Sequence, residues 1–132
     1  MRGVRLLLQT ASIVEGGTGL LLVASSGSPA LFARLVFGAE LSGAGVALGR
    51  LAGMAMLAVG VMSWPTPEVA SSQPRIVCAL LTYNLLTTTY LAHFGIAGGT
   101  TGIMLWPAVA IHAIFALLFA CSLITWRSAT ES

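Results

Sequence analysis

The stretch LLLQTASIVEGGTGLLLVA, residues 6–24, is apolar and long enough to cross a lipid bilayer, yet it carries Glu15 in its middle. A membrane-spanning helix needs about 20 predominantly apolar residues. A carboxylate near the centre of a bilayer is costly, so such a residue faces other helices and finds a partner among them. The stretch therefore predicts a helix within a membrane bundle, with a second polar group close to Glu15.

The composition of the whole chain agrees with a membrane protein. Of 132 residues, 57% are apolar and only 8% are charged, with six Arg, four Glu and no Lys or Asp. Soluble domains carry about 25% charged residues. The net charge of +2 does not indicate a nucleic-acid partner. Cys78 and Cys121 are too far apart to form a Cys-x-x-Cys motif, so we expect two buried apolar thiols.

Four apolar segments approach the length of a span, at residues 4–24, 43–62, 75–94 and 102–125. None shows the alternating pattern of a membrane β-barrel. Because Gln9 and Glu15 interrupt the first segment, we expect a span there rather than a cleaved signal peptide. We predict one transmembrane domain over residues 1–132, an all-α antiparallel four-transmembrane-helix bundle.

The first connection carries its own helical pattern. Pro29 suits a first helical turn, Ala30–Phe37 has an apolar face, and Gly38 follows as a helix stop. We predict a short amphipathic helix in this first outer loop, lying on the membrane surface, with Arg34 and Glu40 toward water.

Arginine placement predicts the orientation. With four spans, one side of the membrane holds Arg2, Arg5, Arg75 and Arg127, and the other holds Arg34. The side richer in Arg is cytoplasmic, so both termini are predicted to be inside. Trp64, Trp106 and Trp126 fall near span ends, where amphipathic rings collect.

Small residues predict helix packing in the second span. Gly45, Gly49 and Gly53 form two successive Gly-x-x-x-Gly steps along one stripe, and Ser12 and Gly16 make a weaker step in the first span. Such a stripe lets a partner backbone approach closely. Both a contact within the bundle and a homo-oligomer seam fit the pattern.

Ionisable groups from three spans fall in one layer of the bundle. By helical rise, Glu15, Arg50 and His112 lie roughly 10–15 Å below the outer surface. We predict an ion pair between Glu15 and Arg50 with His112 beside it, since pairing lowers the cost of burying charge. The third span adds a stripe of Tyr83, Thr87 and Tyr90 and the neighbouring Asn84. The candidates for a ligand site or a buried polar network are Glu15, Arg50, Asn84, Tyr90 and His112.

Several chemistries find no support in the sequence. It contains neither a Gly-x-x-x-x-Gly-Lys phosphate loop nor a His-Glu-x-x-His motif. His93 and His112 differ in depth by more than about 10 Å, which disfavours a bis-histidine haem between them. We expect no catalytic residue, cofactor or metal ion.

Two family resemblances follow from particular segments. Residues 13–19, IVEGGTG, resemble the first span of the small multidrug resistance transporters, four-span proteins in which an embedded Glu exchanges protons for cationic drugs. That family does not expect Arg50. A broader resemblance is to small bacterial four-span inner-membrane proteins of unassigned function, DoxX-like in layout. The similar segments are EGGTGL (15–20), LVFGAEL (35–41), GRLAG (49–53), YN (83–84) and LWPAVAIH (105–112). This resemblance implies a bacterial inner membrane and brings no settled activity.

From these patterns we expect a non-catalytic integral membrane protein, an accessory or structural subunit that packs against partner membrane proteins or itself. The alternative is a protein that binds or transports a small lipophilic molecule, a lipid or quinone, through its polar layer. Intramembrane ionisable groups favour the alternative, whereas the Gly stripe and the absence of a catalytic motif favour the first.

Overall fold

The structure is a computed structural model that describes residues 2–24, 27–66, 73–98 and 101–130, and every regular element in these ranges is an α-helix. The helices are α1 (Arg2–Ala24), α2 (Ser28–Phe37), α3 (Gly43–Met62), α4 (Gln73–Ala97) and α5 (Leu105–Thr130). All except α2 are long and apolar enough to cross a membrane. The predicted all-α four-span bundle with a short helix after the first span is confirmed. Parts of the predicted loops, including Pro67, lie outside the described residues.

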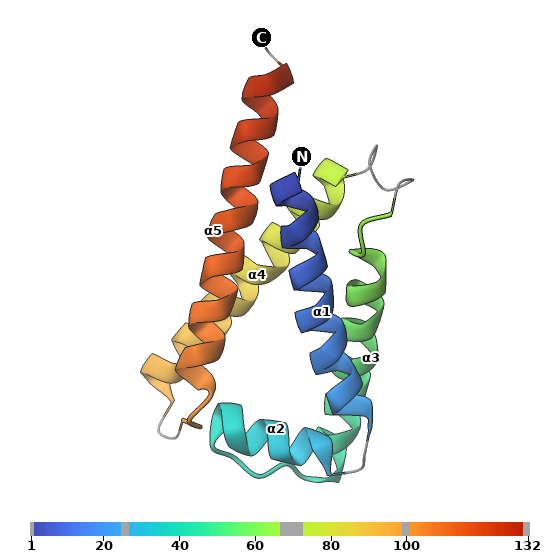
Figure 1. The fold of residues 1–132 in the computed structure, drawn as a ribbon. Helices are drawn as coiled ribbons and strands as arrows, with labels where there is room; N and C mark the ends of the chain where they lie inside the picture. The colour runs from blue at the N-terminus through green and yellow to red at the C-terminus, as the bar shows by residue number, and fades with distance from the viewer. Residues whose placement is uncertain (1, 25–26, 67–72, 99–100, 131–132) are drawn as a thin grey trace.

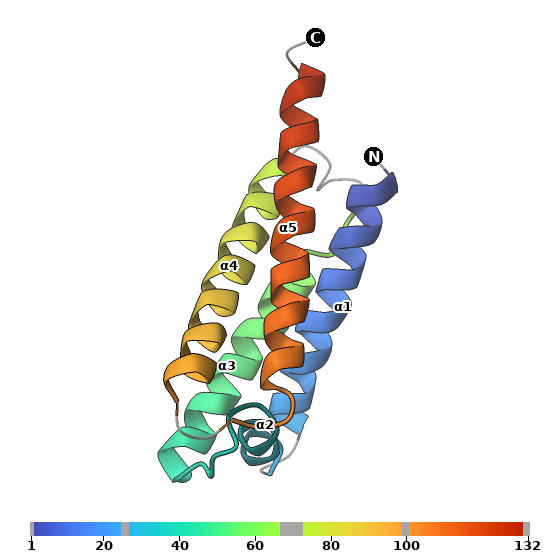
Figure 2. The same ribbon diagram turned by 90° about the vertical axis from the view of Figure 1, so that its left-hand side faces the viewer.

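The four long helices form two pairs. α1 packs chiefly against α3, and α4 packs chiefly against α5 (Figure 1). In the view of Figure 2 all four run close to one long axis. α2 lies crosswise at the end away from the two termini and contacts α1, α3 and α5. The molecule is therefore two antiparallel pairs bridged at one end by a short helix.

The α1–α3 contact depends on glycine. A Cβ on Gly60 would lie 2.7 Å from the Cα of Gly16, and a Cβ on Gly19 would lie 2.6 Å from the Gly53 carbonyl oxygen. Because both obstacles are backbone atoms, a larger residue would push the helices apart. Close backbone approach of this kind is a main source of helix association in lipid.

The predicted stripe of α3 is used inside the chain. Gly53 packs against Leu22 of α1, and Gly49 packs against Pro29 of α2. Gly45 meets only the side chain of Leu41, just before its own helix. Of the two interpretations of the stripe, contact within the bundle accounts for the two glycines that meet another helix.

The short helix α2 has the predicted boundaries and exposure. Pro29 lies in its first turn, and Gly38 ends it with a left-handed φ of 66° while its N–H donates to the Arg34 carbonyl oxygen at 3.1 Å. Glycine adopts this φ without the penalty that a Cβ brings. The exposed side chains of Arg34 and Glu40 form an ion pair at the surface.

A backbone clamp that the sequence did not predict joins α2 to the start of α5. The N–H of Gly102 donates to the Val36 carbonyl oxygen at 3.1 Å, and the N–H of Met104 donates to the Leu35 carbonyl oxygen at 2.8 Å. These bonds satisfy carbonyl groups at the end of α2 that have no partner within the helix. A Cβ on Gly102 would lie 2.1 Å from the Leu35 oxygen, so the clamp requires glycine.

Two apolar clusters join the α4–α5 pair to the rest of the molecule. The first, called the terminal cluster because it lies toward the ends of the chain, joins α1, α4 and α5. Its buried members are Leu8, Ala11, Val77, Leu80, Phe115 and Phe119. The second, the α2 cluster, consists of Val36, Leu91 and Leu105 from α2, α4 and α5.

The two cysteines were expected to be buried, but the structure places both on the surface. Cys78 and Cys121 are both free and exposed on the surfaces of α4 and α5. In a membrane protein, outward-facing helix positions meet lipid, so an apolar thiol needs no protein core around it.

The three tryptophans are also exposed, and Trp106 and Trp126 bound the span of α5.

Candidate functional site

Glu15 is the most deeply buried ionisable group of the described chain, with 1% of its surface exposed. It lies one helical turn beyond Ala11, where the terminal cluster ends. Its partner is Tyr83 of α4, whose hydroxyl donates to Glu15 Oε2 at 2.9 Å. A polar side chain from the other helix pair therefore satisfies one oxygen of the carboxyl group.

The predicted ion pair between Glu15 and Arg50 is wrong. Among the described residues, the one ion pair is that of Arg34 with Glu40. The reason is the register of α1 on α3: Gly16 faces Gly60, so Glu15 lies level with the C-terminal part of α3. Arg50 is ten residues from Gly60, about 15 Å along the helix. The depths of Glu15 and Arg50 were estimated from the ends of their spans, and that estimate did not include the offset between α1 and α3.

Arg50 lies instead near the α2 end of the molecule. It follows Gly49, which packs on Pro29, and it is half-buried. Its Nε atom is buried without a hydrogen-bond partner in the described chain. Arg50 is therefore separate from the polar group around Glu15.

Asn84 and His112, both candidates for a buried polar network, contact each other between α4 and α5. The His112 Nδ1 and Asn84 Oδ1 atoms lie 2.8 Å apart, and Asn84 Nδ2 donates to the Leu80 carbonyl oxygen at 2.8 Å. Because Oδ1 accepts, Nδ1 of His112 is the donor. Asn84 is 1% exposed, so both polar atoms of its amide are paired in a buried site.

Tyr83 connects this contact to Glu15. Its ring meets the His112 ring edge-on, with centroids 5.8 Å apart and planes at 80°. A continuous polar group therefore runs from α1 through α4 to α5. We call Glu15, Tyr83, Asn84 and His112 the polar junction.

Sequence reasoning placed Tyr83 on a polar stripe but did not name it as a site residue. The signal for Tyr83 was its position next to Asn84. Consecutive residues of a helix point in different directions, so one of the two can face α1 while the other faces α5. Tyr90, which was named, is 62% exposed and lies outside the junction. His93 is also exposed, as expected for an interfacial residue.

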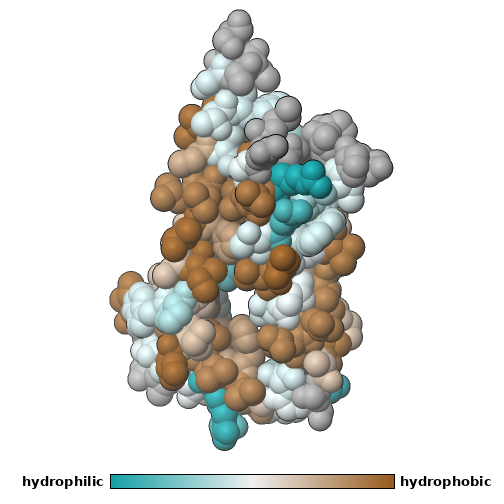
Figure 3. All heavy atoms as spheres, in the orientation of Figure 1, coloured by the Kyte–Doolittle hydropathy of each residue, from teal (hydrophilic) through white to brown (hydrophobic). Residues whose placement is uncertain are grey.

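Side chains do not fill the whole space between the two helix pairs. Figure 3 shows an opening through the molecule, between the α1–α3 and α4–α5 pairs and next to α2. The terminal cluster joins the pairs at one end of this space, and α2 lies across the other end. We call the gap the lateral opening. Glu15 lies one helical turn beyond Ala11, the last α1 residue of the terminal cluster, and is itself buried.

One buried oxygen of the junction has no partner. Glu15 Oε1 is buried and accepts no hydrogen bond in the described chain, and the same holds for the hydroxyl of Thr88 on α4. Unpaired buried polar atoms are rare in proteins and call for an explanation such as a bound molecule. The junction thus contains a buried acceptor that has no donor among the described residues.

The junction does not have the composition of a metal site. The residues that the structure describes contain no group of three or more His, Cys, Asp or Glu side chains placed to hold a metal ion. The arrangement of carboxyl, phenol, amide and imidazole is suited to hydrogen bonding with a polar head group.

Comparison with known proteins adds no relative. No family model matches the chain, and neither a curated protein nor a solved structure matches it. The resemblances to DoxX-like proteins and to small multidrug resistance transporters stay predictions.

Proposed function

We propose that this protein binds a small lipophilic molecule, a lipid or a quinone in its quinol form, in the lateral opening between its helix pairs. The observation that carries the proposal is Glu15 Oε1, a buried acceptor that has no hydrogen-bond partner in the described chain. A head group that donates a hydrogen bond to this oxygen removes the cost of leaving it unpaired. An apolar tail suits the flanking clusters and the surrounding lipid.

Substitution of Glu15 by Gln tests this proposal. The Gln carbonyl oxygen can still accept from Tyr83, while its amide NH₂ replaces the free acceptor by a donor. We expect Glu15→Gln to fold with near-wild-type thermal stability and to lose the molecule. The readout is mass spectrometry of organic extracts of protein purified in mild detergent, with Glu40→Gln as the matched control.

Two probes narrow the class of molecule. A short-chain quinol and a monoacylglycerol both carry donating hydroxyls, and either should raise the unfolding temperature of the wild type but not of Glu15→Gln. The proposal fails if the wild type carries no lipophilic molecule beyond bulk phospholipid and neither probe binds. Equal retention of the molecule by folded Glu15→Gln would also reject it.

A second proposal is the accessory or structural subunit expected from the sequence. The observation that favours it is the outward surface of α3, which has only Gly53 and Gly60 buried among its 20 residues. A partner helix or a second copy of the chain fits such a surface. Chemical crosslinking and native mass spectrometry of gently solubilised membranes test this; a strictly monomeric protein without a co-purifying partner would reject it.

We infer a bacterial inner membrane as the location, with both termini in the cytoplasm. Arg5 and Arg75 lie at the end of the molecule that holds the termini, whereas Arg34 lies on α2 at the other end. This distribution supports cytoplasmic termini. A C-terminal green fluorescent protein fusion should fluoresce and an alkaline phosphatase fusion should be inactive; the reverse pattern would overturn the orientation.

A further inference from the structure

Arg50 carries a charge inside a membrane span, yet the described chain supplies no acceptor for it. The residue is half-buried on α3, its Nε atom is buried without a hydrogen-bond partner, and it forms no ion pair among the described residues. A buried donor without an acceptor costs free energy, and a buried charge without a counter-ion costs more. Ionisable side chains inside membrane spans pair with another group. Arg50 therefore requires a partner from outside the described chain.

Two of the four carboxylates in the sequence are engaged elsewhere. Glu15 accepts from Tyr83, and the register of α1 on α3 places it about 15 Å from Arg50 along the helix. Glu40 lies at the same end of the molecule as Arg50, but it is paired with Arg34 at the surface. Neither carboxylate is therefore the counter-ion of Arg50.

The other two carboxylates, Glu68 and Glu131, come after helix ends that lie away from Arg50. Glu68 follows α3, whose last residue Met62 is twelve residues, about 18 Å, beyond Arg50. Glu131 follows the last residue of α5. Both helix ends lie opposite α2 in the molecule (Figure 1). Because the sequence contains no Asp, the helices of this chain bring no other carboxylate side chain toward Arg50.

A second positive feature lies beside Arg50, at the N-terminal end of α2. A Cβ on Gly49 would lie 2.7 Å from the Cβ of Pro29, so the backbone of Arg50 adjoins the first turn of α2. That turn has no acidic residue, and its N-cap Gly27 offers no side-chain cap. The N-terminal end of a helix carries a partial positive charge. An arginine at this place therefore adds to an existing positive potential, which an anion would neutralise.

The position of Arg50 on α3 leaves it accessible from the lipid side. Ala47 and Met54 are its neighbours one turn to either side on the outer surface, and both are exposed. Arg50 lies about 10 Å from the start of α3. Long basic side chains at such a depth extend toward the head groups. The exposed pair of Arg34 and Glu40 on the α2 side indicates that the head-group layer lies at this end.

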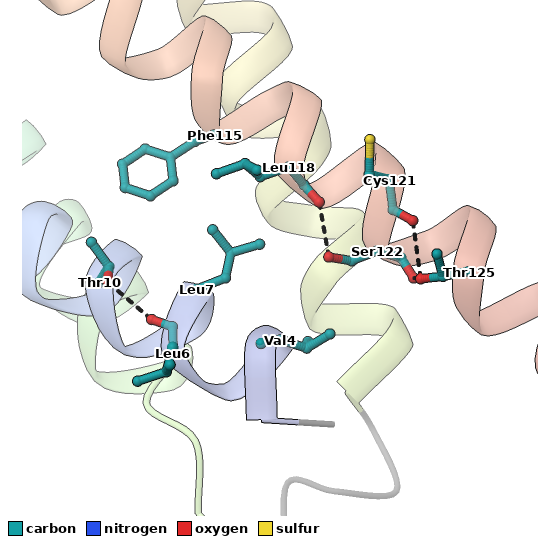
Figure 4. A pocket seen from close by; sticks show the side chains of 10 residues that line it. Val4, Leu6, Leu7, Thr10, Phe115, Leu118, Cys121, Ser122 and Thr125 are labelled. Atoms are coloured by element: carbon teal, nitrogen blue, oxygen red, sulfur yellow. Dashed lines mark hydrogen bonds between the residues drawn. The ribbon is translucent and has the colours of Figure 1, made fainter.

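The groove between α1 and α5 shows that the other polar side chains at a hollow of this molecule are satisfied (Figure 4). Its three hydroxyl groups, of Thr10, Ser122 and Thr125, all donate to carbonyl oxygens one turn back in their own helices. Arg50 has no such bond. The need for an external partner is therefore specific to Arg50 and does not extend to that groove.

We propose that Arg50 binds the phosphate of an anionic phospholipid, at the outer end of α3 beside the first turn of α2. The lipid supplies both the acceptor for the guanidinium group and the negative charge that the chain does not bring there. Basic residues between membrane helices bind anionic head groups in this way. The site is separate from the lateral opening, because it uses none of the residues of the polar junction.

Native mass spectrometry of protein from nanodiscs tests the proposal. The probes are phosphatidylglycerol and phosphatidylcholine with identical acyl chains, mixed in equal amounts. We expect one phosphatidylglycerol to stay bound per chain, in preference to phosphatidylcholine, whose choline offsets the phosphate charge. Arg50→Gln should weaken this binding about fivefold, the effect of one arginine near a membrane surface. Arg34→Gln is the matched control, because Arg34 lies at the same end but is already paired, and it should leave the binding unchanged.

Thermal unfolding in detergent separates a lipid from a soluble anion. Phosphatidylglycerol should raise the unfolding temperature of the wild type and of Arg34→Gln, but not that of folded Arg50→Gln. Equal stabilisation of the wild type by inorganic phosphate would assign the site to a soluble anion and overturn the proposal. Equal retention of both lipids, or an equal loss of phosphatidylglycerol in Arg50→Gln and Arg34→Gln, would also overturn it. Glu15→Gln, which tests the lateral opening, should keep the phosphatidylglycerol, so the two proposals fail independently.

Discussion

The α1–α3 pair is joined by backbone contact, whereas the α4–α5 pair is joined by side chains. In the first, Gly16 lies against Gly60 and Gly19 against Gly53, with no room for a methyl group on Gly19, Gly53 or Gly60. In the second, buried Asn84 bonds to His112. Lipid gives helices no hydrophobic reason to associate, so each pair needs one of these devices. Backbone contact predominates in the first pair, which adds one hydroxyl contact between Ser12 and Ser63 at 2.9 Å, and the side-chain bond predominates in the second.

The contact between the two pairs is weaker than the contact within either pair. The terminal cluster and the bond between Glu15 and Tyr83 join them on the side of the chain termini, and α2 bridges them at the other end. The lateral opening lies between these two connections. The strong contacts within each pair thus provide the scaffold. The less complete contact between the pairs leaves space for a ligand.

The largest effect is expected from crowding the glycine contact. Gly60→Ala puts a methyl group 2.7 Å from the Gly16 backbone and should cost about 1–3 kcal/mol, the usual cost of overpacking. The measurement is reversible unfolding in mixed micelles. Gly17→Ala is the matched control because nothing lies within 4 Å of its added Cβ. Equal stability of the two variants would show that the pairs do not differ as described.

A smaller effect is expected from the polar contact of the other pair. Asn84→Leu keeps the branched shape of the side chain but removes the partner of His112 Nδ1, and should cost about 1 kcal/mol. Thr89→Val is the control, since the Thr89 hydroxyl is exposed and bonds only within its own helix. If Asn84→Leu were as stable as this control in the same unfolding assay, the α4–α5 contact would not depend on this bond.

The smallest effect is expected outside both pairs. Arg34→Gln breaks the exposed pair with Glu40 and should change stability by less than about 1 kcal/mol, because solvent screens such pairs. The change should shrink further in high salt. An effect as large as that of Gly60→Ala would mean that α2, rather than the helix pairs, limits stability.

The features that depend on neighbouring residues could be predicted from the sequence. The predicted span at 43–62 coincides with α3, and α2 ends before Gly38 as its pattern indicates. Burial of Glu15 followed from the cost of a carboxylate in lipid. Asn84 and His112 were both named as members of a polar network, but their contact with each other was not predicted.

The partner of Glu15 could not be predicted in the same way. It depends on the register of one helix against another, which the contact of Gly16 with Gly60 sets. An error of a few residues at each span end is enough to bring Arg50 to the wrong depth. Charge favoured Arg50 as the partner, whereas the structure supplies the neutral hydroxyl of Tyr83.

Two double-mutant cycles on unfolding stability test the central claim, that Glu15 is held by Tyr83 and not by Arg50. One cycle combines Glu15→Ala with Tyr83→Phe, and the other combines Glu15→Ala with Arg50→Ala. We predict a coupling energy of about 0.6 kcal/mol in the first cycle, the average for hydrogen bonds between membrane helices, and none in the second. Coupling to Arg50 with none to Tyr83 would contradict the register of the helices and the polar junction built on it.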